Sequence, residues 1–228
     1  MLFMRFYIII LIIFSLFTSC VDMKVNEKEN NLPNDVRWLA NSSEYVAICK
    51  QTYMNALSSM QSVFLNTTNP IIIMDLDETV LDNSKYQIDL FLNNTQYNEI
   101  SWDHFVNKEI SDLVPGAKDF IINYKKYTNA RIIYISNRSH ATLEATKNNM
   151  KKLGIYFEDD IFLLRKDKED TKVVRRNEVF NGSNRMSQYG SQKVLAYFGD
   201  AMGDFPKDTN YEFSINKFIF PNPMYGKW

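Results

Sequence analysis

The segment IIIMDLDET at residues 71–79 constrains the fold of this chain more than any other part of its sequence. Its first four residues are large and apolar, which is typical of a strand buried in the centre of a sheet. The strand ends in two carboxylates, Asp75 and Asp77, which need a cationic partner because an unpaired buried charge is costly. We expect Mg²⁺ there, and the D-x-D-x-T pattern favours a phosphoryl-transfer enzyme. The alternative is a strand that ends in an ordinary charged turn.

Strand-like and helix-like segments alternate along the rest of the chain. The spacing of apolar residues predicts helices over residues 35–64, 117–124 and 140–153. Short apolar runs predict further strands over residues 131–136, 161–164, 193–199 and 217–220. This alternation predicts an α/β fold with a Rossmann-like parallel sheet flanked by helices. A polar and aromatic stretch at residues 83–114, helical around Trp102, predicts a small helical cap over the strand tips.

Polar side chains stand at the ends of three of the predicted strands. Asp75 follows the first strand, the tripeptide Ser-Asn-Arg at residues 136–138 follows the second, and Asp200 follows a third. Ligands of open parallel sheets bind beyond the carboxyl ends of the strands. We therefore expect these residues to meet in one site, which a random scatter of polar residues would not produce.

The N-terminus has the layout of a signal peptide at residues 1–19. Arg5 is followed by an apolar stretch of about a dozen residues, shorter than the roughly 20 needed to span a bilayer, and then by small residues before Cys20. These small residues resemble a bacterial lipobox, which implies lipidation of Cys20. Residues 20–33 would then form a tether to the membrane. The expected location is the bacterial cell envelope, at the outer membrane; ordinary cleavage that leaves Cys20 without a lipid is the alternative.

Composition limits the remaining possibilities. The chain carries 26 Lys and Arg against 27 Asp and Glu, and this balance argues against a nucleic-acid polymer as partner. Besides Cys20 the only cysteine is Cys49, so we expect no intrachain disulfide in the mature protein. Residues 34–228 are enough for one domain with a sizeable core, with the cap inserted at about 83–114.

The strand-end residues occur in the order of the motifs of the haloacid dehalogenase (HAD) superfamily, which the chain resembles. The superfamily's D-x-D-x-[TV] loop matches Asp75–Thr79, its strand-end hydroxyl matches Ser136, and its acidic G-D-x-x-x-D segment matches Gly199–Asp204. The resemblance implies a HAD-like fold and a phosphoryl-transfer site.

The chain is more closely similar to the lipoprotein e(P4)-like acid phosphatases, which are lipid-anchored bacterial 5'-nucleotidases. The shared segments, spread in order over nearly all of the mature chain, include DLDETVLDNS at 75–84, VPGA at 114–117, SNR at 136–138, KDK at 166–168 and PN at 221–222. Two positions of the acidic segment depart from this group, since Ala201 and Gly203 replace a polar and an acidic side chain. The group's lysine matches Lys172 if one residue is inserted before it, and Lys168 is the rival.

The resemblance implies hydrolysis of phosphomonoesters through an aspartyl-phosphate. Asp75 would be the nucleophile, and Asp77 would be the general acid and then the general base. The ligands of Mg²⁺ would be Asp75, the backbone carbonyl of Asp77 and Asp200, with Asp204 beside them.

The remaining site residues follow from the same resemblance. Ser136 and Lys172 would stabilise the phosphoryl group, and Asn137 and Arg138 would contact substrate. Trp102 and Tyr225 match aromatic positions that stack against a nucleobase, so a 5'-nucleotide is the expected substrate. Arg138 is also compatible with a simple ion pair to an acid of the cap, and the two aromatic residues with core packing.

Other functions fit parts of the same pattern. A phosphatase of sugar phosphates would need the same carboxylates without the aromatic contacts. A non-catalytic surface binding lipoprotein would have little reason to keep Asp75, Asp77 and Asp200 close together, because like charges repel. A homodimer is compatible with the resemblance.

Overall fold

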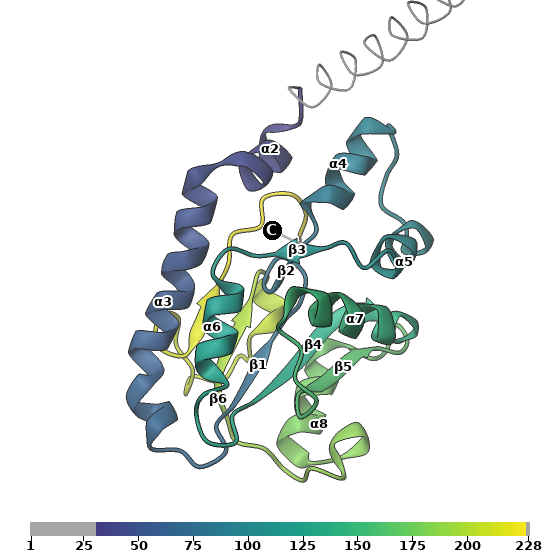
Figure 1. Cartoon of the computed structure of the whole chain (residues 1–228). Helices are drawn as coiled ribbons and strands as arrows, with labels where there is room; N and C mark the ends of the chain where they lie inside the picture. The colour runs from purple at the N-terminus through teal and green to yellow at the C-terminus, as the bar shows by residue number, and fades with distance from the viewer. Residues whose placement is uncertain (1–30, 227–228) are drawn as a thin grey trace, which may run out of the picture.

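A computed structural model of the chain describes residues 31–226. Its centre is a five-stranded sheet in the order β5-β4-β1-β6-β7, with every neighbouring pair parallel. The strands are β1 (Ile71–Met74), β4 (Arg131–Ser139), β5 (Ile161–Arg165), β6 (Val194–Gly199) and β7 (Lys217–Ile219). This arrangement confirms the expected Rossmann-like parallel sheet, and it places the Asp75 strand in the middle (Figure 1).

Both faces of the sheet are covered, which explains why its strands are apolar throughout. Along β1, Ile72 and Met74 belong to one hydrophobic cluster, whereas Ile71 and Ile73 belong to another on the opposite face. The first cluster includes side chains of α3 (Ser43–Leu65), α6 (Ala117–Tyr124) and α7 (Leu143–Leu153). The second includes Val179 of α8 (Lys172–Asn181). The fold is therefore a three-layer α/β/α arrangement.

The predicted helix over residues 35–64 is divided in two. Ser42 has extended backbone angles; it ends α2 (Asn34–Asn41) and begins α3, where its hydroxyl accepts a hydrogen bond of 3.0 Å from the Tyr45 amide. Serine competes for backbone hydrogen bonds in this way and so favours a cap over a helix interior. The apolar spacing continues across this break, which is why periodicity alone did not reveal it.

The predicted cap corresponds to two short helices above the strand ends. These are α4 (Ser84–Leu92) and α5 (Glu99–Asn107), and a small antiparallel pair, β2 (Leu81–Asp82) and β3 (Asp112–Leu113), lies at their base (Figure 1). Tyr86, Phe105 and Val106 form a small separate cluster, with Trp102 packed against it. The cap thus has its own apolar contacts while it remains attached to the sheet through β2 and β3.

Several expectations fall outside the described residues. The signal peptide, the lipidation site Cys20 and most of the tether lie before residue 31. Within residues 31–226, no helix has the length and hydropathy required to cross a bilayer. Cys49 is buried in α3 as a free thiol.

Candidate active site

The carboxyl ends of β1 and β6 bring the acidic motifs together. The Asp75 amide donates a 2.9 Å hydrogen bond to the Phe198 carbonyl, which extends the pairing of these strands by one residue. As a result, carboxylate oxygens of Asp75, Asp200 and Asp204 lie within 4.8 Å of one another. The structure thus brings together three acids that the sequence places as far as 129 residues apart, from 75 to 204.

Lys172 supplies the positive charge that this cluster needs. Its ammonium group lies 2.8 Å from Oδ1 of Asp75 and also contacts Asp204, and its side chain is only 12% exposed. The lysine reaches the cluster because Thr171 caps α8, accepting a hydrogen bond from the Val174 amide, so that Lys172 is the first residue of the helix. Of the two lysines left open by the sequence, the structure places Lys172 against the acids.

Burial and mutual repulsion dominate the electrostatics of the acids. Burial raises the pKa of Asp75 well above its ordinary value, although Lys172 opposes this shift. Burial and the neighbouring Asp204 raise the pKa of Asp200 to about 6, while a 2.7 Å hydrogen bond from the Asn222 amide lowers it. Burial lowers the pKa of Lys172, but the attraction to Asp75 and Asp204 outweighs it and holds this pKa above the value of a free lysine. The electrostatics of the site therefore favour the binding of a cation.

The acidic cluster fits a divalent metal. Its donors are carboxylate oxygens, which are hard ligands of the kind that Mg²⁺ and similar cations prefer. Asp75, Asp200 and Asp204 would hold the ion, together with the backbone carbonyl predicted at Asp77. Ala201 and Gly203, the two departures from the related group, leave the three carboxylates in place.

Gly199 permits the close approach of Asp204 to the strand end. A Cβ atom at Gly199 would lie 2.4 Å from both Cβ and Oδ2 of Asp204, a distance that real side chains do not adopt. Asp204 in turn accepts a 3.0 Å hydrogen bond from the Ala201 amide, which fixes the turn. The glycine of the G-D-x-x-x-D motif is thus required by packing.

Asp77 lies beside this cluster but has different partners. Its Oδ2 accepts a 3.2 Å hydrogen bond from the Ser136 hydroxyl, and its Oδ1 accepts one of 2.9 Å from the side-chain amide of Asn83. The buried Arg138 guanidinium also contacts Oδ1. The side chain of Asp77 is 16% exposed, so part of it remains accessible to solvent.

The loop after Asp77 is fixed from two directions. Glu78 has a φ of +53° and is buried. Its carboxylate accepts a 3.0 Å hydrogen bond from the backbone amide of Asn83. The Tyr53 hydroxyl of α3 donates a 2.5 Å hydrogen bond to the Thr79 carbonyl. These contacts fix the turn and hold the loop in a conformation that few non-glycine residues adopt.

The end of β4 is joined to α8 by a buried arginine that the sequence analysis missed. Arg175 donates hydrogen bonds to the carbonyls of Ser136 and Leu163, and one of 2.7 Å to the side chain of Asn137. Its position one helical turn after Lys172 was the available signal. The guanidinium holds the backbone of the Ser-Asn-Arg segment relative to Lys172, and it occupies the carboxamide oxygen of Asn137.

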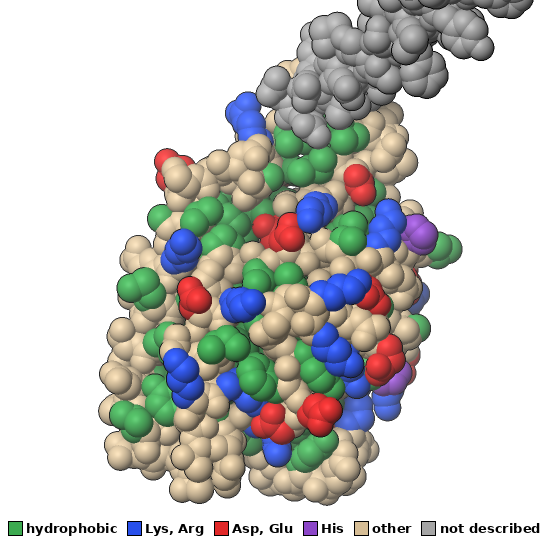
Figure 2. Space-filling view, in the orientation of Figure 1, with side chains coloured by type: hydrophobic (Ala, Val, Ile, Leu, Met, Phe, Trp, Pro, Cys, Tyr) green, Lys and Arg blue, Asp and Glu red, His purple; other side chains and the backbone are tan. Residues whose placement is uncertain are grey.

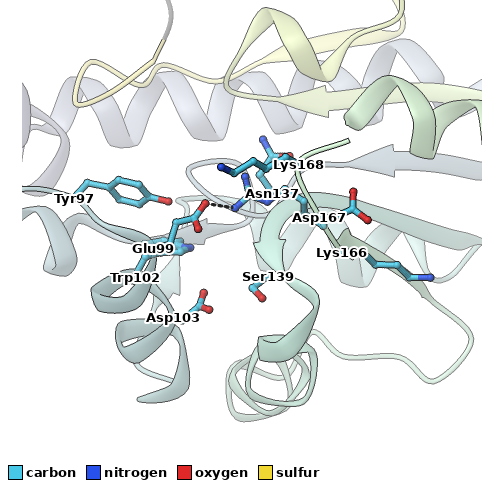
Figure 3. A pocket seen from close by; sticks show the side chains of 10 residues that line it. Tyr97, Glu99, Trp102, Asp103, Asn137, Ser139, Lys166, Asp167 and Lys168 are labelled. Carbon is cyan, nitrogen blue, oxygen red and sulfur yellow. Dashed lines mark hydrogen bonds and ion pairs between the residues drawn. The ribbon is translucent and has the colours of Figure 1, made fainter. Parts of the chain in front are cut away.

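An open pocket borders Asn137 on the cap side. It is about 150 Å³ in volume; its lining residues are Tyr97, Glu99, Trp102, Asp103, Asn137, Ser139, Arg165, Lys166, Asp167 and Lys168. Figure 3 shows Tyr97, Glu99 and Trp102 reaching it from the cap, with Glu99 paired to a residue of the opposite wall; this partner is Arg165, at 2.9 Å. The pocket is thus a cleft between cap and sheet.

Two aromatic residues predicted for the substrate occupy different places. Trp102 lines this pocket, whereas Tyr225 is 39% exposed on the C-terminal loop and is not among the lining residues. Tyr97, which was not identified from the sequence, lines the pocket instead. Lys168, the other candidate for the active-site lysine, is exposed and lines the side of the pocket that faces the cap. The surface shown in Figure 2 has basic and acidic side chains interspersed.

Comparisons with known proteins agree with this fold. Residues 17–228 match the family model described as HAD superfamily, subfamily IIIB (acid phosphatase). The class C acid phosphatase of Bacillus anthracis superimposes with a TM-score of 0.70; the structure with tungstate bound is 29% identical and covers 84% of each chain. A second structure of that enzyme is 28% identical and covers 89% of this chain and 87% of the other. The stem 31 kDa glycoprotein of Glycine max is 27% identical over 161 residues, which span 59% of its length.

Proposed function

The chain belongs to the acid phosphatases of HAD subfamily IIIB, and on this premise we propose that it is a magnesium-dependent phosphomonoesterase that hydrolyses 5'-nucleotides. The observation that carries the proposal is the contact between Lys172 and the buried carboxylates of Asp75 and Asp204 beside the ends of three parallel strands. Lys172 can neutralise negative charge on a phosphoryl group, and Asp75 can attack its phosphorus.

In the first half-reaction a carboxylate oxygen of Asp75 forms a bond to phosphorus. The bond between phosphorus and the ester oxygen breaks, and Asp77 delivers a proton to that oxygen, so that the alcohol leaves. Lys172, which already contacts Asp75, offsets negative charge on the phosphoryl group, and the Ser136 hydroxyl lies within reach as a donor. The product is an aspartyl-phosphate on Asp75.

In the second half-reaction water attacks the phosphorus of this aspartyl-phosphate. Asp77, now a carboxylate, accepts the proton of the water, and the bond between phosphorus and Asp75 breaks to release orthophosphate. A bound Mg²⁺ would supply electrostatic neutralisation between the anionic nucleophile and the anionic ester. Asp75, Asp200 and Asp204 are the side chains that would hold it.

The pocket on the cap side suits the leaving group of a nucleotide. Tyr97 and Trp102 offer aromatic surface to a base, and stacking of this kind tolerates any base. Broad use of 5'-nucleotides is therefore the expected preference. A sugar phosphate would use the same carboxylates without this aromatic surface.

We place the enzyme in the bacterial cell envelope, at the outer membrane, attached through a lipid on Cys20. The support for this location is the signal-peptide layout and the small residues before Cys20. Labelling of cells with a radioactive fatty acid tests it: the wild type should be labelled and Cys20→Ala should not.

Activity of the detergent-solubilised full chain tests the proposed reaction. We expect hydrolysis of p-nitrophenyl phosphate and of 5'-nucleotides that needs added Mg²⁺ and is lost in Asp75→Asn, which removes the nucleophile. A folded wild type that hydrolyses none of these esters with any divalent metal would contradict the proposal. The preference within the panel then separates nucleotides from sugar phosphates.

A further inference from the structure

Arg138 is one of the buried charged residues next to the site. The whole residue is 1% exposed, and its guanidinium side chain is 0% exposed. Besides Asp77, its nitrogens contact the Thr146 hydroxyl at 3.2 Å and the Asn83 side chain at 3.2 Å. These partners occupy the guanidinium from several directions, so little of it is available to a substrate.

The two carboxylate oxygens of Asp77 differ in the number of hydrogen-bond donors around them. Three donors lie around Oδ1: Nε of Arg138 at 2.9 Å, a terminal guanidinium nitrogen of Arg138 at 2.8 Å, and the side-chain amide of Asn83 at 2.9 Å. Oδ2 receives only the Ser136 hydroxyl at 3.2 Å. Because three donors surround Oδ1, Oδ2 is the oxygen with capacity left to exchange a proton.

The same guanidinium is supported from the cap base. The Ser111 hydroxyl donates a 2.7 Å hydrogen bond to Asn83, and the Ser111 backbone exchanges two hydrogen bonds of 3.0 Å with the Asn149 side chain of α7. The ring of Trp102 lies 5.7 Å from the guanidinium carbon of Arg138. A rigid network thus fixes Arg138 between the catalytic loop, α7 and the pocket wall.

We propose that Arg138 is a positioning residue that presents Oδ2 of Asp77 to the ester oxygen of the substrate, and that it does not itself bind the substrate. This role rests on the proposed function, since it assumes that Asp77 is the general acid. It replaces the substrate contact expected for Arg138 from the sequence. The two nitrogens that Arg138 directs at Oδ1 fix the position of that oxygen, and together with the Ser136 hydroxyl at Oδ2 they limit rotation of the carboxylate.

The role predicts a selective kinetic defect. A general acid is needed to expel a poor leaving group such as phenolate, but much less to expel p-nitrophenolate, whose charge is delocalised. The two aryl phosphates otherwise have nearly the same shape, and kcat/KM reports only the steps up to loss of the alcohol. Misplacement of Oδ2 should therefore lower kcat/KM for phenyl phosphate far more than for p-nitrophenyl phosphate.

The experiment compares kcat/KM for both esters in the wild type and in Arg138→Gln. We expect the ratio of p-nitrophenyl to phenyl phosphate to rise by about tenfold or more, a part of the 10²- to 10⁴-fold that a positioned general acid contributes. Arg138→Lys keeps the buried charge but supplies one donor group in place of two, so its ratio should lie between the other two. A thermal melt of each variant establishes that it is folded.

Thr146→Val is the matched control, because it removes one partner of the same guanidinium but leaves the contacts of Arg138 with Asp77 and Asn83 in place. Its ratio should equal that of the wild type. In an Asp77→Asn background, Arg138→Gln should have no further effect on the ratio, since the proton that it positions is gone.

The outcomes separate the two proposals. If Arg138→Gln or Arg138→Lys lowers kcat/KM for both esters by the same factor, the positioning role is wrong and a structural or phosphate-binding role replaces it. If the wild type hydrolyses neither ester, the proposed function fails and this inference with it. If Arg138→Gln does not fold, the ratio measured for Arg138→Lys decides. A ratio above that of the wild type supports the positioning role, and an unchanged ratio refutes it.

Discussion

Replacement of Lys172 by methionine tests the electrostatic design of the site without any measurement of catalysis. Lys172 has two carboxylate partners, and its side chain is 12% exposed. Removing one partner of a buried ion pair costs about 3–5 kcal/mol, because the other charge is left uncompensated. A domain of this size loses about 2–4 °C in melting temperature for each kcal/mol, so Lys172→Met should melt about 6–20 °C lower at pH 8.

The loss should be smaller at low pH. Burial already raises the pKa of Asp75, and loss of the lysine, the main group that opposes this shift, raises it further. The folded variant then binds more protons than the unfolded chain at pH values above the ordinary carboxyl pKa of about 4. Its stability therefore falls as pH rises through this range. A larger fraction of Asp75 is protonated at pH 5 than at pH 8, so the difference in stability from the wild type should be smaller at pH 5.

Differential scanning calorimetry at pH 5 and pH 8 measures both effects, with Lys168→Met as the control, because Lys168 is exposed. Added Mg²⁺ should raise the melting temperature of Lys172→Met more than that of the wild type, since the ion replaces the missing charge. A drop of less than about 2 °C at pH 8, or an equal drop at both pH values, would refute the reasoning.

Three further changes test neighbouring features. Gly199→Ala should displace Asp204, because the new Cβ would lie 2.4 Å from it, and isothermal titration should show Mg²⁺ binding weakened by about tenfold or more; unchanged binding would contradict the packing argument. Burial raises the pKa of Asp160 to about 6, so this group should contribute about 1–2 kcal/mol to the fall in wild-type stability between pH 5 and pH 8, and urea unfolding should show the fall smaller by that amount in Asp160→Asn. Tyr97→Ala should lower kcat/KM for 5'-AMP by about tenfold with little effect on p-nitrophenyl phosphate, whereas equal effects of Tyr97→Ala and Tyr225→Ala would argue against the pocket as the base site.

The parts of the site that could be predicted are those with a local signal. Asp75, Ser136 and Asp200 each follow an apolar run that can only be a buried strand, and the topology of a parallel sheet brings such strand ends together. No tertiary information is needed for that inference. The lysine was ambiguous between Lys168 and Lys172, because both lie in one charged segment and only the start of a helix at Thr171 distinguishes them.

The parts that could not be predicted depend on tertiary contacts. The helix α8 was missed because its buried face carries Arg175, Arg176 and Glu178, which sequence patterns assign to solvent. These charges are paired or hydrogen-bonded inside the protein, so burial does not follow hydrophobicity there. Tyr97 was missed for a different reason: it lies in a loop before α5 and reaches the pocket only through the position of the cap.

The central place of β1 has a consequence for how the enzyme acquires activity. Its two neighbours, β4 and β6, are separated from it in the chain by about 60 and 120 residues, so their pairing with β1 closes long loops. Contacts of such high sequence separation form late and slowly during folding. Any partly folded chain that lacks either neighbour lacks part of the catalytic machinery. Recovery of turnover during refolding should therefore follow the slowest structural phase, and a chain released from the ribosome stays catalytically silent until its whole sheet has assembled.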